Sequence, residues 1–81
     1  MISLFAAPLS LLTETETEIV RLLAAGHNTP QIARLMNRSL HTVRTHIRNA
    51  AEKLEAHGRL DLLARARRLG IIGTGDAADR L

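Results

Sequence analysis

Residues 29–54 read TPQIARLMNRSLHTVRTHIRNAAEKL, and this stretch decides the fold. Apolar residues recur with a helical period on both sides of a three-residue break at residues 37–39. Thr29 is a good N-cap residue, and Pro30 suits the first helical position because the N–H that it lacks has no helical partner there. Ser39 stands where the second helix needs its N-cap. The stretch therefore predicts two helices joined by a tight turn.

The second helix, expected over about residues 40–54, has two very different faces. Its apolar stripe consists of Leu40, Val43, Ile47, Ala50, Ala51 and Leu54. Its polar face carries His41, Thr42, Arg44, Thr45, Arg48 and Asn49. The shorter first helix has its apolar positions at Ile32, Ala33, Leu35 and Met36. A short helix, a tight turn and a second helix with a basic outer face are typical of the helix-turn-helix.

Two further helices are expected around this pair. Thr13 and Glu16 form a capping-box pattern at the start of one of them, which Gly26 would end. The last helix is expected over about residues 60–69 and ends at Gly70. Its apolar side consists of Leu62, Leu63, Ala66 and Leu69. The sequence thus predicts an all-α fold, a small four-helix domain with a central helix-turn-helix.

The length of 81 residues allows one domain with a small core. We expect this domain to span residues 12–72, with an N-terminal extension or linker at residues 1–11 and a flexible tail at residues 73–81. The chain has no cysteine, which excludes disulfides, thiolate metal sites and cysteine nucleophiles.

The distribution of charge is more informative than the net charge of +3. Ten of the eleven basic residues are Arg, and no acidic residue occurs within residues 19–51. The arginines of that block are Arg21, Arg34, Arg38, Arg44 and Arg48. Such a block favours a polyanionic partner. A solvated basic surface with no partner is the alternative on charge alone.

Other function classes find little support in the sequence. His41 and His46 are five residues apart, which directs them to different sides of a helix, so we expect no metal site. The serines at positions 3, 10 and 39 lie in no nucleophile motif, and we expect neither enzymatic activity nor a cofactor. The apolar residues 1–12 are too few to span a bilayer. We therefore expect a cytoplasmic protein without a membrane partner.

The basic face has the geometry needed to read DNA. Arg44 and Arg48 are four residues apart and so share one face of a helix, with Thr45 beside them. The forked guanidinium matches both phosphate and the guanine edge. Thr42 lies in the first helical turn, where backbone N–H groups favour phosphate. The alternative is an amphipathic core helix whose basic face is merely solvated.

The chain resembles the LuxR-type helix-turn-helix domain of bacterial transcription regulators over residues 12–72. The resemblance lies in LTETETEIVRLLAAG (residues 12–26), IARLM (32–36), SLHTVRTHIRNAAEKL (39–54) and LGII (69–72). No single piece is specific, but the order and the spacing together are.

This resemblance implies a DNA-binding transcription regulator that recruits or blocks RNA polymerase. It implies base reading by Arg44, Thr45 and Arg48, and phosphate contacts by Thr42 and Thr29. It also implies a homodimer through the last helix, about residues 60–69, with two recognition helices in successive major grooves. Further candidates for phosphate contact are His41, His46 and Arg38, although His46 also fits a packing role.

The chain departs from the family pattern at several positions. Glu55 stands where a Gly is common, and we expect Gly58 to take over the turn after the third helix. Pro30 replaces a usual Lys, which removes one phosphate contact. We also expect Arg59 to pair with Glu16 and tie the last helix to the first.

Two other functions stay open from the sequence. One is the promoter-reading end of a sigma factor, which shares the helix-turn-helix pattern. The other is a helical protein-interaction or dimerisation module that does not touch DNA and binds through its last helix and the apolar N-terminal segment.

Overall fold

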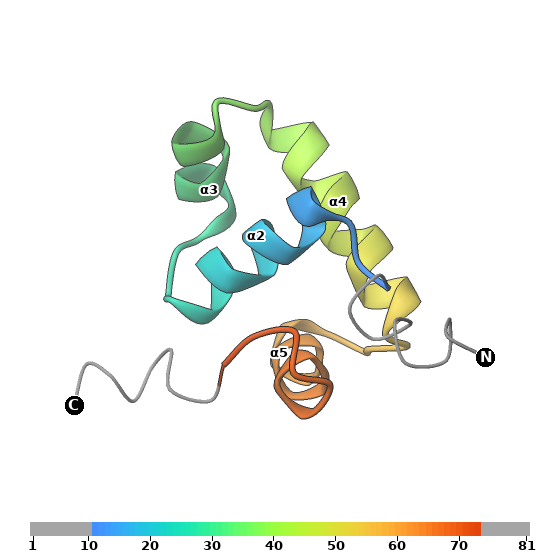
Figure 1. The fold of residues 1–81 in the computed structure, drawn as a ribbon. Helices are drawn as coiled ribbons and strands as arrows, with labels where there is room; N and C mark the ends of the chain where they lie inside the picture. The colour runs from blue at the N-terminus through green and yellow to red at the C-terminus, as the bar shows by residue number, and fades with distance from the viewer. Residues whose placement is uncertain (1–10, 74–81) are drawn as a thin grey trace.

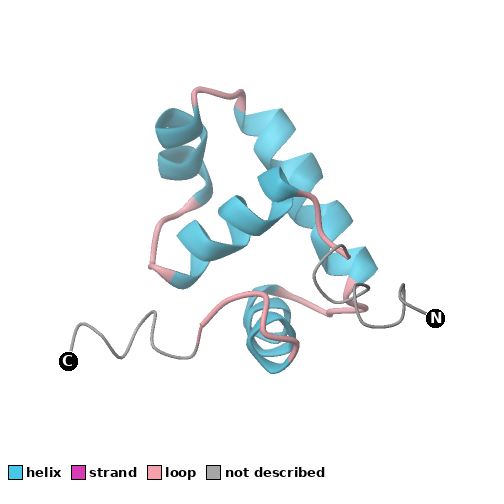
Figure 2. Ribbon diagram, in the orientation of Figure 1, coloured by secondary structure: helices cyan, strands magenta, loops and turns pink. Residues whose placement is uncertain are grey.

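The computed structural model describes residues 11–73. This part of the chain contains four helices and no strand. The helices are α2 (Glu14–Ala24), α3 (Thr29–Met36), α4 (Leu40–Lys53) and α5 (Arg59–Arg68). The predicted all-α fold with a central helix-turn-helix, formed by α3 and α4, is therefore confirmed (Figures 1 and 2). Most of the expected extension and tail, residues 1–10 and 74–81, lies outside the described residues.

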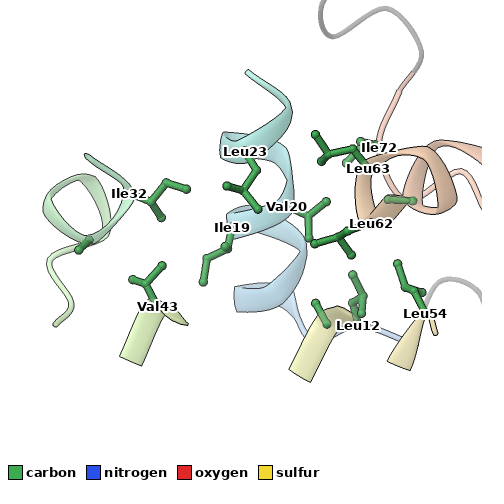
Figure 3. Close-up of a cluster of buried hydrophobic side chains, with 13 residues drawn as sticks. Leu12, Ile19, Val20, Leu23, Ile32, Val43, Leu54, Leu62, Leu63 and Ile72 are labelled. Atoms are coloured by element: carbon green, nitrogen blue, oxygen red, sulfur yellow. The ribbon is translucent and has the colours of Figure 1, made fainter. Parts of the chain in front are cut away.

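Helix α2 lies at the centre and contacts each of the other three helices. On one side, Ile19 faces Ile32 of α3 and Val43 of α4; on the other, Val20 faces Leu62 of α5 (Figure 3). All five side chains are at most 1% exposed. Burying one such side chain stabilises the fold by about 1.5–3 kcal/mol. The helix-turn-helix and α5 are thus held on opposite sides of one helix.

Helices α2 and α3 both begin with a capping box, in which the side chains of the N-cap and N3 residues each accept a hydrogen bond from the other's backbone N–H. The Thr13 backbone N–H donates to Oε1 of Glu16, and the Glu16 N–H donates to Oγ1 of Thr13, both at 3.0 Å, as the sequence predicts. At α3 the predicted N-cap Thr29 is wrong, because Asn28 is the cap. Its side chain accepts from the N–H of Gln31 at 2.9 Å, and Gln31 accepts from the N–H of Asn28 at 2.8 Å. Thr29 is therefore the first residue of the helix.

The turn between α3 and α4 occupies residues 37–39, as predicted. Asn37 adopts the left-handed conformation with φ 55° and ψ 48°, which Asn tolerates better than most residues. Ser39 caps α4, and its Oγ accepts from the N–H of Thr42 at 3.0 Å. The turn therefore sets where α4 begins relative to α3.

Two leucines expected in the core are instead exposed. Leu35 is 60% exposed, because the buried arc of α3 covers Ile32 and Ala33 and Leu35 lies roughly 100° away from it around the helix. Leu69 is 42% exposed, because α5 ends at Arg68 and the chain turns back there. Ile72, at 2% exposure, fills the space beside α5.

The turn after α4 corrects another expectation. Glu55 itself adopts the left-handed conformation, with φ 55°, so Gly58 does not replace the missing Gly of the family pattern. Gly58 has its own positive φ, 130°, as the N-cap of α5. The left-handed conformation costs a residue with a Cβ about 1–2 kcal/mol. The chain therefore carries local strain at an exposed position.

We expect Glu55→Gly to stabilise the domain by about 0.5–1 kcal/mol, since Gly relieves the strain but loses more backbone entropy on folding. Urea unfolding of both proteins measures the difference. Gly58→Ala is the control: nothing lies within 4 Å of the added Cβ, so its destabilisation would report backbone strain alone. A less stable Glu55→Gly protein would contradict this account of the turn.

One partly buried ion pair joins α2 to α4. Glu16, only 3% exposed, accepts a hydrogen bond from Nζ of Lys53 at 2.7 Å. The predicted pair between Glu16 and Arg59 is therefore wrong: Nη2 of Arg59 donates to the backbone carbonyl of His27 at 2.8 Å. Burial alone would raise the pKa of Glu16, but the hydrogen bonds from Lys53 and from the Thr13 N–H lower it below its ordinary value of 4.5.

This lowered pKa predicts acid sensitivity. A carboxylate whose pKa is lower in the folded state stabilises the fold above its unfolded pKa, and that stabilisation is lost as the pH falls through the folded pKa. We expect the free energy of unfolding to decline below about pH 5. Urea unfolding from pH 7 to pH 3 tests this, and Glu16→Gln should flatten the decline. An unchanged pH profile in that variant would exclude Glu16 as a source of the effect.

Candidate nucleic-acid interface

The outer face of α4 carries the predicted base-reading residues. Arg44 and Arg48 are both exposed and lie one turn apart, and Thr45 beside them is partly buried. The opposite side of the helix is anchored by Val43 and Ala50, both 0% exposed. With 14 residues α4 is about 21 Å long. A major groove about 12 Å wide admits a helix of this kind.

The start of α4 is arranged to donate hydrogen bonds. Oγ of Ser39 donates to Oγ1 of Thr42 at 2.8 Å and also accepts from the Thr42 N–H. Because Oγ1 of Thr42 accepts this bond, its own O–H stays available to a further acceptor. His41 and Arg38 are exposed on either side of Ser39. Three of the predicted phosphate-contacting residues therefore lie around the N-terminus of α4.

A shallow hollow brings Thr29 close to Arg48. It measures about 260 Å³ and lies between the start of α3, the middle of α4 and the start of α5. Arg59 also lines it, above the apolar side chains Leu23, Ile47, Ala51 and Leu62. Thr29, a predicted phosphate-contacting residue, and Arg48, a predicted base-reading residue, therefore line the same hollow.

His46 is placed differently from the other predicted site residues. It lies roughly 160° around α4 from Arg48, and its charge helps to lower the pKa of Glu16 on α2. Its Nδ1 is buried and has no hydrogen-bond partner among the described residues. Of the two roles considered for His46, this position favours packing against α2 over contact with phosphate.

The exposed arginines of the helix-turn-helix form no ion pair within residues 11–73. The ion pairs there join Arg21 to Glu18, Lys53 to Glu16 and Arg65 to Asp61. None of them involves the exposed arginines of α3, the turn and α4, which are Arg34, Arg38, Arg44 and Arg48. Such a surface attracts a polyanion.

Sequence reasoning missed two features of this region. The cap at Asn28 has a detectable signal, since Gln31 three residues later completes a capping box. The hydrogen bond from Arg59 to the carbonyl of His27 has no signal in the sequence, because every residue carries a backbone carbonyl.

No helix within residues 11–73 is long and apolar enough to cross a membrane. In the same part of the chain no group of three His, Cys, Asp or Glu side chains is placed to hold a metal ion.

The fold and the basic outer face of α4 define a helix-turn-helix domain. The family model for bacterial regulatory proteins of the luxR family (GerE) matches residues 10–66. The chain belongs to this family, and it is a DNA-binding domain of the kind that regulates transcription. The resemblance inferred from the sequence is confirmed.

Curated relatives agree with this assignment. The chain is 38% identical over 60 residues to the uncharacterized response regulatory protein YgeK of Escherichia coli, covering 74% of this chain and 41% of that protein. It is 43% identical over 53 residues to the nitrate/nitrite response regulator NarP of E. coli (65% and 25%). It is 37% identical over 59 residues to the transcriptional regulatory protein DesR of Bacillus subtilis (73% and 30%). The match thus spans less than half the length of each relative, and no solved structure matches the chain.

Proposed function

We propose that this domain binds double-stranded DNA in a sequence-specific way, with α4 in the major groove, as the effector domain of a transcription regulator acting in the bacterial cytoplasm. The observation that carries the proposal is the pair of exposed arginines, Arg44 and Arg48, one turn apart on a helix that Val43 and Ala50 anchor in the core. Neither arginine has a carboxylate partner within residues 11–73.

Arg44, Arg48 and Thr45 are the proposed base-reading residues. Each guanidinium can donate two hydrogen bonds to O6 and N7 of a guanine, and Thr45 can offer its methyl group to a thymine. Arg48 and Thr29 line the same hollow, so the two residues would meet neighbouring parts of the duplex.

Phosphate contacts would come from Thr42, Thr29, His41 and Arg38. The hydroxyl of Thr42 can donate to a phosphate oxygen, and the first N–H groups of a helix favour negative charge. These contacts fix the register of the protein on the duplex without reading its sequence. They also make the affinity fall steeply as the salt concentration rises.

Helix α5 is the proposed homodimer contact. Its side away from α2 exposes Ala64 and Leu60, the latter to 83%, and Leu69 follows the helix at 42%. Two copies related by a two-fold axis would cover these side chains. They would also present two α4 helices about 34 Å apart, to successive major grooves. RNA polymerase would then be recruited or blocked at the bound site.

The exposed leucines fit a second function equally well, a protein-interaction module that does not touch DNA. The family assignment supports the regulator over this module and over a sigma-factor end. Selection of bound duplexes from a random DNA library at about 0.15 M salt tests the proposal. Enrichment of two inverted half-sites about one helical turn apart is the expected result. A library without enrichment would overturn it.

A further inference from the structure

The relative orientation of α5 and the helix-turn-helix is fixed through few contacts. Leu62, Leu63 and Ala66 attach α5 to α2, and most of α3 and α4 lies on the other side of α2 (Figure 3). Leu54, at the C-terminal end of α4, lies beside Arg65 and Leu69. Apolar packing of this kind gives two helices a preferred crossing angle with a scatter of about 15–20°. A hydrogen bond is directional and would narrow the angle between α5 and α4 further.

One long-range hydrogen bond supplies this direction. Nη2 of Arg59, the first residue of α5, donates at 2.8 Å to the carbonyl of His27, 32 positions earlier. Within residues 11–73 it is the only long-range side-chain hydrogen bond that involves α5. His27 immediately precedes Asn28, the cap that begins α3. The bond therefore joins the start of α5 to the start of the helix-turn-helix.

The chain that leads into α5 provides little orientation of its own. Gly58 is the N-cap of α5 and, having no side chain, makes no side-chain capping bond. Between the end of α4 and the start of α5, the backbone turns at Glu55 and Gly58, which both have positive φ angles. At this end of α5, the backbone N–H of His57 donates to Oδ2 of Asp61 at 2.8 Å. This hydrogen bond lies within one short segment, so it does not orient α5 against the other helices. Among the side-chain hydrogen bonds of residues 11–73, the bond of Arg59 is the one that links α5 to the segment preceding α3.

We propose that Arg59 is a positioning residue that sets the angle between α5 and the helix-turn-helix. In a dimer formed through α5, this angle determines the distance and the rotation between two α4 helices. Arg59 would thus select the spacing between the two half-sites of a target without reading a base. The effect on half-site spacing rests on the proposed function, whereas the angle between α5 and the helix-turn-helix is a property of a single chain.

Distances between two spin labels in one chain test the angle directly. The chain has no cysteine, so Glu52→Cys on α4 and Arg67→Cys on α5 give two unique labelling positions outside the proposed contacts, and dilution with unlabelled protein confines the measured distances to one chain. We expect one narrow distance distribution, which Arg59→Ala broadens or shifts and Arg59→Lys largely restores because an ammonium can also donate to the carbonyl. His27→Ala keeps the backbone acceptor and should change nothing. An unchanged distribution in Arg59→Ala would overturn the proposal.

Binding to DNA tests the consequence for spacing. The probes are the duplex selected by the unaltered protein, versions lengthened by one to three base pairs between the half-sites, and a single half-site. Arg59→Ala should reduce an about tenfold preference for the selected spacing to about twofold, with half-site affinity kept within about twofold. An equal loss on the half-site would show that Arg59 contacts DNA and would overturn the positioning role. If no duplex is selected at all, the proposed function fails, while the label distances still decide the role of Arg59.

Discussion

Replacing both Arg44 and Arg48 with Ala is expected to weaken binding to the selected duplex by about 30-fold or more. Each bidentate contact between Arg and guanine contributes about 1–3 kcal/mol, and about 1.4 kcal/mol corresponds to a factor of ten. Both side chains are exposed, so the free energy of unfolding should change by less than about 0.5 kcal/mol. Fluorescence anisotropy of a labelled duplex measures the affinity, and urea unfolding measures the stability.

Loss of two positive charges also weakens binding without any base reading, so the control must match the charge. Arg21→Ala with Arg68→Ala removes two exposed arginines that lie outside α3 and α4. This pair should weaken binding by only a few-fold, and the effect should vanish at higher salt. Equal losses in the two double variants would contradict base reading. Unchanged binding in Arg44→Ala, Arg48→Ala would show that another surface holds the duplex and would contradict the proposed role of α4.

Lys53→Met is expected to destabilise the domain by about 2–3 kcal/mol, the largest effect on folding that we predict. Removing one partner of a fully buried ion pair costs about 3–5 kcal/mol, and we reduce this range because the Lys53 side chain is 37% exposed. Glu16, with its side chain 4% exposed, would keep a carboxylate in an apolar environment. Urea unfolding at pH 7 measures the loss, which is a large part of a total on the order of 5–10 kcal/mol.

The double variant Glu16→Gln, Lys53→Met separates the charge from the packing. Gln can still accept the Thr13 N–H, so the capping box is kept, and the double variant should lie within about 1 kcal/mol of the unaltered protein. In Lys53→Met alone, burial raises the pKa of Glu16, so its deficit should shrink as the pH falls and Glu16 takes up a proton. A deficit below about 0.5 kcal/mol at pH 7 would contradict the importance of this pair.

Local signals in the sequence predicted most of the fold. The box of Thr13 and Glu16, and the break at residues 37–39, mark helix boundaries through hydrogen bonds between near neighbours, which residue types reveal. Leu35 was placed wrongly because apolar character alone does not give the width of the buried arc on a short helix. The left-handed φ of Glu55 was missed because nothing in a Glu signals it.

The site was predictable where it depends on one helix and not where it depends on several. The spacing of Arg44 and Arg48 places them on one face, and the structure has both exposed there. The partner of Glu16 could not be chosen between Lys53 and Arg59, because the choice depends on how α4 and α5 cross α2. Long-range geometry of this kind follows from packing and not from spacing.

Methylation interference on the selected duplex shows directly whether α4 reads bases in the major groove. Methylation at N7 of guanine blocks the major-groove acceptor that Arg44 and Arg48 would use, whereas methylation at N3 of adenine modifies the minor groove. We expect N7 methylation at guanines within each half-site to abolish binding, and Arg44→Ala or Arg48→Ala to remove the interference at one guanine each. Interference confined to adenine N3, or none at either position, would contradict the account.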